Sequence, residues 1–239
     1  MSGHWVLIEQ DQVPLRCWWN DPQKGGKHFV LVLPEVFGIN SWVRSIVDRF
    51  AEKDIPALAM PLFARTAPYL NLGYNEDDLL EGRRHKDQTT TRQILDDAAS
   101  CLYWLKQQYG QSKITVVGFC FGGHAALITS TLPEVDVTFD FYGAGVATTR
   151  PGGGSPSLEL LSNISGKFIC ICGNADPLIP LVDRTAIKNA LIKEDPSQNR
   201  LSYLEIDDAD HGFMCEERAS FDLNASNVCW QLLMKELSS

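Results

Sequence analysis

Residues 116–127, VVGFCFGGHAAL, decide the fold. Two β-branched valines before a glycine are typical of the end of a buried strand, and the alanine- and leucine-rich end of the stretch is typical of a helix. Between them lies the pattern Gly-x-Cys-x-Gly, formed by Gly118, Cys120 and Gly122. This spacing predicts a strand that turns directly into a helix. Cys120 stands at the turn, and glycines occupy the two positions where larger side chains would collide.

On both sides of this turn, from residue 28 onward, short apolar runs alternate with longer segments whose apolar residues recur at helical spacing. The predicted strands are residues 28–35, 55–61, 113–119, 135–143, 167–173 and 201–206. The predicted helices are residues 41–54, 91–110, 122–132, 180–194 and 220–237. This alternation predicts an α/β fold, a doubly wound and mostly parallel sheet with helices on both faces. The earlier segments 4–10 and 15–19 are predicted to add antiparallel strands.

Two segments interrupt the alternation of strands and helices. Residues 62–88 form a long polar and aromatic excursion after a predicted strand, and residues 147–157, ATTRPGGGSPS, form a loop rich in Gly, Pro and Ser. Long loops at the carboxyl ends of strands are where open α/β sheets place their binding sites. We therefore expect both segments near a binding site.

Length and composition limit the possible classes of protein. The chain has 239 residues, of which 44% are hydrophobic, so we expect a single domain over residues 1–239. Its net charge of −9 makes nucleic acids and anionic membranes poor partners. The first residues lack the basic and apolar regions of a signal peptide, and we expect a cytoplasmic protein, either a monomer or a small homo-oligomer.

The seven cysteines indicate neither a disulfide framework nor a metal site. Their number is odd, and no CxxC pair or Cys/His ligand spacing is present. Six of them fit free thiols in a reducing compartment. Cys120 differs because Gly-x-nucleophile-x-Gly between a strand and a helix is the nucleophile-elbow arrangement, and a helix N-terminus favours a thiolate. A structural cysteine or a phosphate-binding loop is the alternative interpretation.

A nucleophilic thiol needs a base, and the elbow arrangement places the acid and then the histidine after the nucleophile. His211 satisfies this order because it follows the last predicted strand, in IDDADHGF. The other histidines precede the nucleophile or lie on the helix that follows it, and they are His4, His28, His85 and His124.

The acid that would orient this base is predicted to be Asp176, in CICGNADPLIP, in the loop after the preceding strand. An Asx turn or a helix cap is the alternative role for Asp176. Asp140 is its rival, since some hydrolases take the acid from one strand earlier. Asp207, Asp208 and Asp210 lie too close to His211 in the same loop.

Six segments together resemble the dienelactone hydrolases, which are α/β-hydrolases with a cysteine nucleophile. They follow one another in order over most of the chain and are LPEVFGIN, MPLFART, VVGFCFGG, DFYGAG, GNADPLIP and DADHGF. The resemblance implies the α/β-hydrolase fold, Cys120 as nucleophile, His211 as base and Asp176 as acid. It also implies that Glu35 helps to convert the thiol to a thiolate when substrate binds.

The resemblance further implies that the backbone N–H groups of Phe121 and Val36 stabilise the oxyanion, and that no cofactor or metal is needed. Its known members use two arginines to bind a substrate carboxylate. Here the candidates are Arg65, Arg83, Arg84 and Arg218, and the sequence does not align them uniquely.

The predicted function is hydrolysis of a small-molecule carboxylic ester or lactone through a thioester on Cys120. A general carboxylesterase or thioesterase of the same fold is one alternative. A non-catalytic domain in which Cys120 serves packing or redox sensing is another.

Overall fold

The computed structural model describes residues 3–9, 13–22, 27–110 and 112–238. The strands are β1 (His4–Ile8), β2 (Leu15–Asn20), β3 (His28–Leu33), β4 (Ala57–Ala59), β5 (Lys113–Phe119), β6 (Val137–Phe141), β7 (Lys167–Gly173) and β8 (Leu201–Ile206). The helices are α1 (Ser41–Ala51), α2 (Glu76–Asp87), α3 (Thr91–Tyr109), α4 (Phe121–Thr129), α5 (Leu181–Glu194) and α6 (Leu223–Leu237), with a 3-10 helix at Ser157–Asn163.

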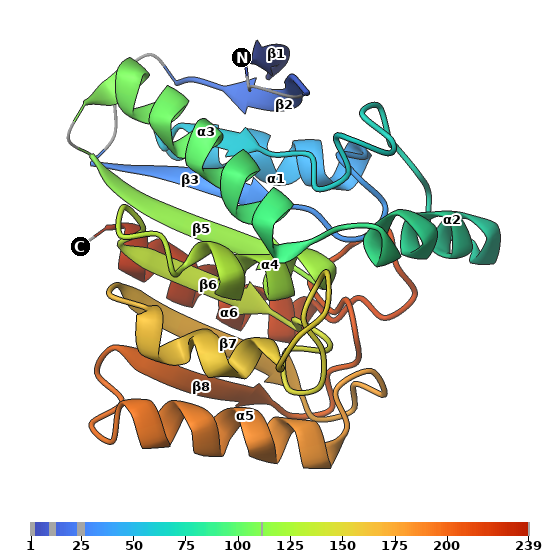
Figure 1. The fold of residues 1–239 in the computed structure, drawn as a ribbon, viewed down its shortest axis with the longest axis vertical. Helices are drawn as coiled ribbons and strands as arrows, with labels where there is room; N and C mark the ends of the chain where they lie inside the picture. The colour runs from blue at the N-terminus through green and yellow to red at the C-terminus, as the bar shows by residue number, and fades with distance from the viewer. Residues whose placement is uncertain (1–2, 10–12, 23–26, 111, 239) are drawn as a thin grey trace.

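All eight strands form one sheet in the order β1-β2-β4-β3-β5-β6-β7-β8. From β4 to β8 every neighbouring pair is parallel, whereas β1–β2 and β2–β4 are antiparallel (Figure 1). This confirms the predicted mostly parallel sheet with antiparallel N-terminal strands. β4 is shorter than the predicted strand 55–61 because Pro56 and Pro61 flank it, and proline has no N–H to donate to a neighbouring strand.

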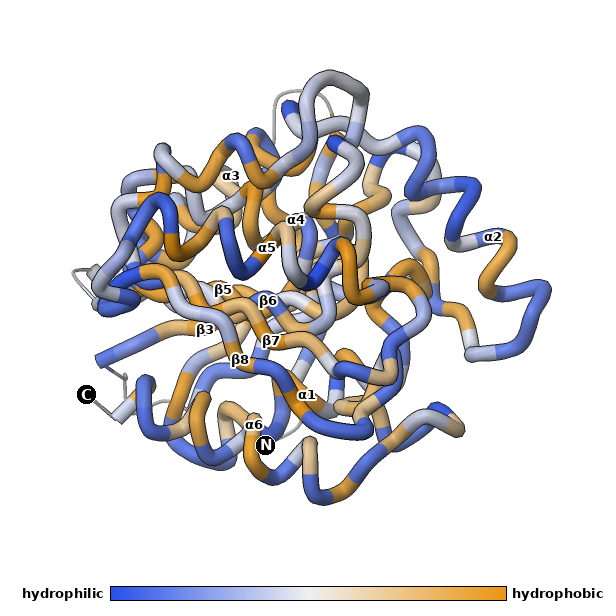
Figure 2. Tube along the Cα trace, turned by 90° about the horizontal axis from the view of Figure 1, so that it is seen from below, coloured by the Kyte–Doolittle hydropathy of each residue, from blue (hydrophilic) through white to orange (hydrophobic). Residues whose placement is uncertain are grey.

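Helices cover both faces of the sheet. Figure 2 shows α3, α4 and α5 on one face and α1 and α6 on the other. Along β3 the side chains alternate accordingly. Val30 and Val32 belong to one core cluster, and Leu31 and Leu33 to the other. Both sets are fully buried, which explains why the parallel strands are continuously apolar in sequence.

The excursion over residues 62–88 differs from the predicted loop because its second half is the helix α2. This helix is polar, so its sequence has no apolar periodicity from which a helix could be predicted. Its ends carry the usual stabilising groups instead. The Asn75 side chain accepts a hydrogen bond from the Asp78 N–H, three acidic residues form the first turn, and Arg84, His85 and Lys86 lie in the last.

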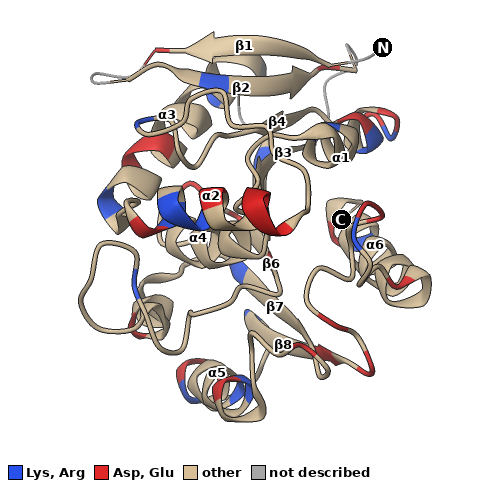
Figure 3. Ribbon diagram, turned by 90° about the vertical axis from the view of Figure 1, so that its right-hand side faces the viewer, with Lys and Arg blue, Asp and Glu red and all other residues tan. Residues whose placement is uncertain are grey.

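The carboxyl ends of β3, β5, β7 and β8 lie at the same edge of the sheet, and α2 lies beyond that edge (Figures 1 and 3). The loops that leave these four strands carry Glu35, Cys120, Asp176 and His211. Parallel topology therefore gathers at one edge residues that are up to 176 positions apart in the chain. Within the described residues, no helix is both long enough and apolar enough to cross a bilayer.

Candidate active site

Cys120 occupies a left-handed turn between β5 and α4, with φ 55° and ψ −120°. A Cβ atom at Gly118 would overlap the carbonyl oxygen of Gly122, and one at Gly122 would overlap that of Leu33. The backbone segments therefore approach closely only because both positions are glycine. The turn leaves Cys120 partly exposed, whereas the other six cysteines are buried. The sequence-predicted elbow is present.

His211 and Asp176 form a buried hydrogen-bonded pair. The Nδ1 atom of His211 lies 2.7 Å from Oδ2 of Asp176, and the two side chains are 5% and 0% exposed. The other Asp176 oxygen, Oδ1, accepts a hydrogen bond from the Leu178 N–H at 2.7 Å. The ring of Tyr142 packs edge-on against the imidazole, with centroids 5.1 Å apart. These contacts fix the orientation of the ring.

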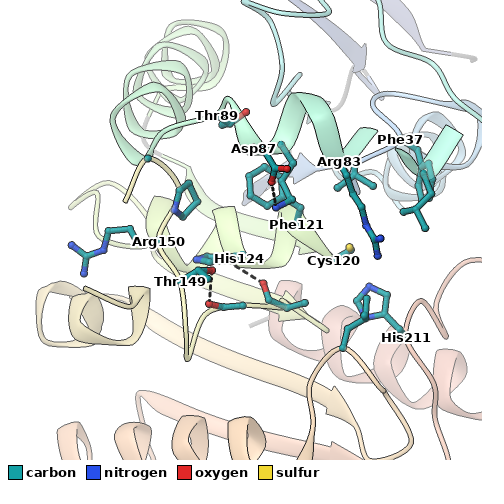
Figure 4. Close-up of a pocket in the computed structure, with 18 of the residues that line it drawn as sticks. Phe37, Arg83, Asp87, Thr89, Cys120, Phe121, His124, Thr149, Arg150 and His211 are labelled. Atoms are coloured by element: carbon teal, nitrogen blue, oxygen red, sulfur yellow. Dashed lines mark hydrogen bonds and ion pairs between the residues drawn. The ribbon is translucent and has the colours of Figure 1, made fainter. Parts of the chain in front are cut away.

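The second ring nitrogen of His211, Nε2, has no hydrogen-bond partner among the described residues. Burial alone would lower the pKa of His211, but the nearby Cys120 sulfur and Asp176 outweigh it and raise the pKa to about 10. Figure 4 shows Cys120 and the imidazole beside each other at one end of a cavity. The raised pKa favours a protonated His211 ring at neutral pH.

Glu35, at the carboxyl end of β3, is almost completely buried. Its Oε1 atom accepts a hydrogen bond from Nη1 of Arg218 at 2.8 Å. Burial raises the pKa of Glu35, although Arg218 and His211 oppose the shift. Arg218 reaches the site because Gly212, with φ 84°, has no side chain where the guanidinium lies.

The cavity has a volume of about 720 Å³. It extends from Cys120 and His211 along α4 toward the loop that contains Thr149 and Arg150 (Figure 4). Its lining includes sequence-predicted residues from four segments, namely Val36, Arg83, Cys120, Phe121, His211 and Arg218. The N–H groups of Val36 and Phe121 have no acceptor among the described residues.

Of the four candidate arginines, Arg83 and Arg218 line the cavity, whereas Arg65 and Arg84 lie outside it. Arg65 makes a two-point contact with Asp97, at 2.7 and 2.8 Å, and Arg84 binds Glu81 on the solvent side of α2. Both contacts hold the guanidinium groups away from the cavity, so we do not retain Arg65 or Arg84 as substrate-binding candidates. The choice between Arg83 and Arg84 depends on which face of α2 each side chain occupies, and the sequence expectation of a loop could not supply that information.

Neither Asp140 nor the other histidines join the site chemistry. Asp140 is fully buried, and burial raises its pKa to about 7. His124 lines the cavity, but Ala144 and Ser157 occupy its two ring nitrogens at 3.1 and 2.7 Å. Burial lowers the pKa of His124 to about 4, so its ring is neutral. His85 binds Glu81 on α2.

Sequence reasoning placed residues 62–88 and 147–157 near a binding site but did not single out several of their cavity residues. Leu79 and Lys86 share one face of α2 with the predicted Arg83, and Thr149 to Gly153 come from the Gly/Pro/Ser loop. The spacing of 79, 83 and 86 is a helical signal, but only one of the three residues is apolar.

The dienelactone hydrolase family model matches residues 17–238. A Synechocystis protein with the provisional name carboxymethylenebutenolidase is 31% identical over 229 residues, which cover 95% of this chain and 92% of that protein. The carboxymethylenebutenolidase of Pseudomonas putida is 24% identical over 168 residues, 70% of this chain and 68% of that one. A Klebsiella pneumoniae structure, provisionally named a dienelactone hydrolase, superposes with a TM-score of 0.85 at 19% identity and covers 99% of this chain and 98% of its own.

Proposed function

The chain belongs to the dienelactone hydrolase family, and we propose that it hydrolyses its ester or lactone substrate through a thioester on Cys120. Family membership makes it a hydrolase of ester or lactone type. One observation supports the finer mechanism above all. Cys120 lines a cavity beside a histidine whose other nitrogen is held 2.7 Å from a buried aspartate. This is the nucleophile–base–acid order of a catalytic triad.

In the first step, the Cys120 thiolate attacks the carbonyl carbon, and the π electrons move to the carbonyl oxygen. The free N–H groups of Phe121 and Val36 would stabilise this oxyanion. When the tetrahedral intermediate collapses, the carbon–oxygen bond to the alcohol breaks, and the departing alkoxide takes a proton from the His211 imidazolium. The acyl group is then held on Cys120 as a thioester.

In the second step, the neutral His211 accepts a proton from water as the water attacks the thioester carbonyl. The second tetrahedral intermediate uses the same two N–H groups and expels the thiolate, so that the acid product leaves. The imidazolium and the thiolate are regenerated together. Asp176 keeps Nδ1 protonated throughout, which leaves Nε2 to exchange the proton.

Glu35 and Arg218 would link substrate binding to activation of the thiol. Arg218 lines the cavity and also holds Glu35, so an anionic substrate competes with Glu35 for the guanidinium. A buried carboxylate that loses its counter-charge gains affinity for a proton. We propose that Glu35 then takes the proton from any Cys120 that is still a thiol.

Arg83 is the best-placed group to recognise a carboxylate on the substrate. It is exposed, lines the cavity, and has no ion-pair partner among the described residues. In Figure 4 its side chain extends toward Cys120 and His211. An arginine can bind a carboxylate through two parallel hydrogen bonds, which is a strong and directional contact.

The test is a Cys120→Ala variant assayed with p-nitrophenyl acetate. We expect hydrolysis to fall to background while the thermal unfolding temperature stays close to that of the wild type. His211→Ala should lower the rate by roughly 10²–10⁴ and allow an acetyl adduct on Cys120 to be detected by mass spectrometry. Wild-type hydrolysis in Cys120→Ala would refute the proposal.

The cavity volume of about 720 Å³ favours a second candidate, a general carboxylesterase or thioesterase. This volume lies in the range that drug-sized ligands fill, so a small lactone would leave much of it empty. A panel of lactones, aryl esters and acyl thioesters, each with and without a carboxylate, separates the two candidates by kcat/KM. Iodoacetamide provides the test for a non-catalytic domain: a catalytic Cys120 should be alkylated selectively with loss of hydrolysis, whereas a Cys120 that serves packing would not react while the protein is folded.

A further inference from the structure

Helix α2 rests on the loop that carries Val36, and the contact is made at Gly82. Only Gly82 and His85 of this helix are buried. A Cβ atom built on Gly82 would overlap the carbonyl oxygen of Val36, and it would lie 3.0 Å from the Val36 carbonyl carbon and 3.1 Å from its Cβ. The contact therefore joins helix backbone to loop backbone, with no flexible side chain between them to absorb a change.

Glycine at this position destabilises the helix relative to alanine. Gly82 lies in the middle of a 12-residue helix, where glycine is the poorest helix former after proline. Nothing in the backbone of α2 requires it, because Gly82 is not among the residues with positive φ. The close approach to Val36 is the remaining reason for a glycine here.

Both sides of this contact are anchored. On α2, the buried His85 ring lies tilted against Phe63, with centroids 6.0 Å apart, and Asn75 caps the first turn. On the loop, the Phe37 carbonyl accepts a hydrogen bond from the Leu72 N–H at 3.0 Å. Extra volume at Gly82 cannot be relieved by moving either side alone without breaking one of these contacts.

We propose that Gly82 is a positioning residue that seats α2 on Val36 and so holds the Val36 N–H where the oxyanion forms. This inference rests on the proposed function, because it acts through the Val36 amide. The neighbouring residue, Arg83, lines the same cavity. The contact between Gly82 and Val36 therefore positions both the proposed oxyanion donor, the Val36 N–H, and the candidate carboxylate-binding residue, Arg83.

The test is Gly82→Ala assayed with the neutral ester p-nitrophenyl acetate, so that Arg83 has no anion to bind. Alanine is the better helix former, and on propensity alone this variant would be as active as the wild type and more stable. We expect kcat to fall at least tenfold, since loss of one oxyanion donor costs about 10²–10³. KM should stay within threefold, because acylation and deacylation both pass through an oxyanion and slow together.

Alkylation of Cys120 by iodoacetamide distinguishes failure of this inference from failure of the proposed function. If Gly82 acts through Val36, the variant alkylates at the wild-type rate within threefold while kcat falls. An unchanged kcat, or a changed KM with unchanged kcat, overturns the role of Gly82 and leaves the Cys120 mechanism standing. If Cys120→Ala is active, the proposed function itself fails.

Two further variants complete the design. Asp77→Ala changes an exposed residue on the same helix and should leave kcat unchanged. His85→Ala removes the other buried anchor of α2 without adding volume, so it tests the seat even if Gly82→Ala does not fold. We expect His85→Ala to lower kcat at least threefold at constant KM, and wild-type kcat in this variant would overturn the inference.

Discussion

The pKa of His211 is shifted by its neighbours in the site. Burial by itself would make its ring neutral, yet the neighbouring sulfur and Asp176 raise its pKa to about 10. Because the pKa is raised, the ring holds its proton at neutral pH and releases it only as the pH rises through about 10. The proposed mechanism uses this directly, since a protonated His211 is ready to protonate the departing alkoxide.

The pKa of His211 is therefore predicted to depend on Cys120. In a pH titration of the ring followed by NMR, the wild-type His211 should titrate near pH 10. In Cys120→Ala its pKa should fall by about 1–3 units, the usual effect of removing an adjacent opposite charge. His124 is the internal control, because burial sets its pKa of about 4, and it should titrate identically in both proteins. An unchanged His211 titration in Cys120→Ala would contradict the thiolate–imidazolium pair.

The adjacent residues Arg83 and Arg84 lie on different faces of helix α2. Arg83 faces the cavity with Leu79 and Lys86, and Arg84 faces solvent and binds Glu81 at 2.8 Å. In Figure 3 the ribbon of this helix carries both positively charged (blue) and negatively charged (red) residues. A helix of mixed charge thus presents a cation to the cavity although the whole chain carries a net charge of −9.

The two arginines form a matched pair for mutation. With an aryl ester that bears a carboxylate, Arg83→Met should raise KM roughly ten- to a hundredfold, the effect of losing a hydrogen bond to a charged group. KM for the neutral ester of the same shape should not change. Arg84→Met should leave both values within twofold of the wild type. Equal effects of the two substitutions would show that long-range charge, and not contact with Arg83, determines affinity.

The strands of the described residues belong to one hydrogen-bonded sheet. Eight strands are continuous from β1 to β8, and an apolar core lies on each face. Two contacts also connect distant segments at the site edge, Ser41 and Trp42 of α1 binding Glu217 and Glu216 at 2.9 and 2.7 Å. We propose on this basis that residues 1–239 form a single domain.

A single domain should unfold in one cooperative transition. Thermal unfolding followed by far-ultraviolet circular dichroism and by tryptophan fluorescence should give the same midpoint. The six tryptophans make this a demanding comparison, because they lie on β1, β2, α1, α3 and α6. Two separate midpoints would show that the N-terminal hairpin or another part of the sheet unfolds independently.

Much of the fold could be predicted because its signals are local. The Gly-x-Cys-x-Gly turn, the apolar parallel strands and the alternation of strand and helix all lie within short windows of sequence. The segment after β4 could not be predicted in the same way. Helix α2 is stabilised by the Asn75 cap and by the charges at its ends. Because it contacts the Val36 loop through a glycine, its sequence has no apolar stripe at helical spacing that would have predicted the helix.

The sequence by itself determined the class of fold, the elbow at Cys120 and the order in which Asp176 and His211 follow it. Only the tertiary structure decided which groups meet: Asp176 and not Asp140 at His211, Arg83 and not Arg65 or Arg84 at the cavity, and Arg218 against Glu35. The physical reason is the distance along the chain over which the interactions act. Turn strain and hydrophobic periodicity act between near neighbours in the chain, whereas Arg218 and Glu35 are 183 residues apart and meet only because parallel strands end at one edge.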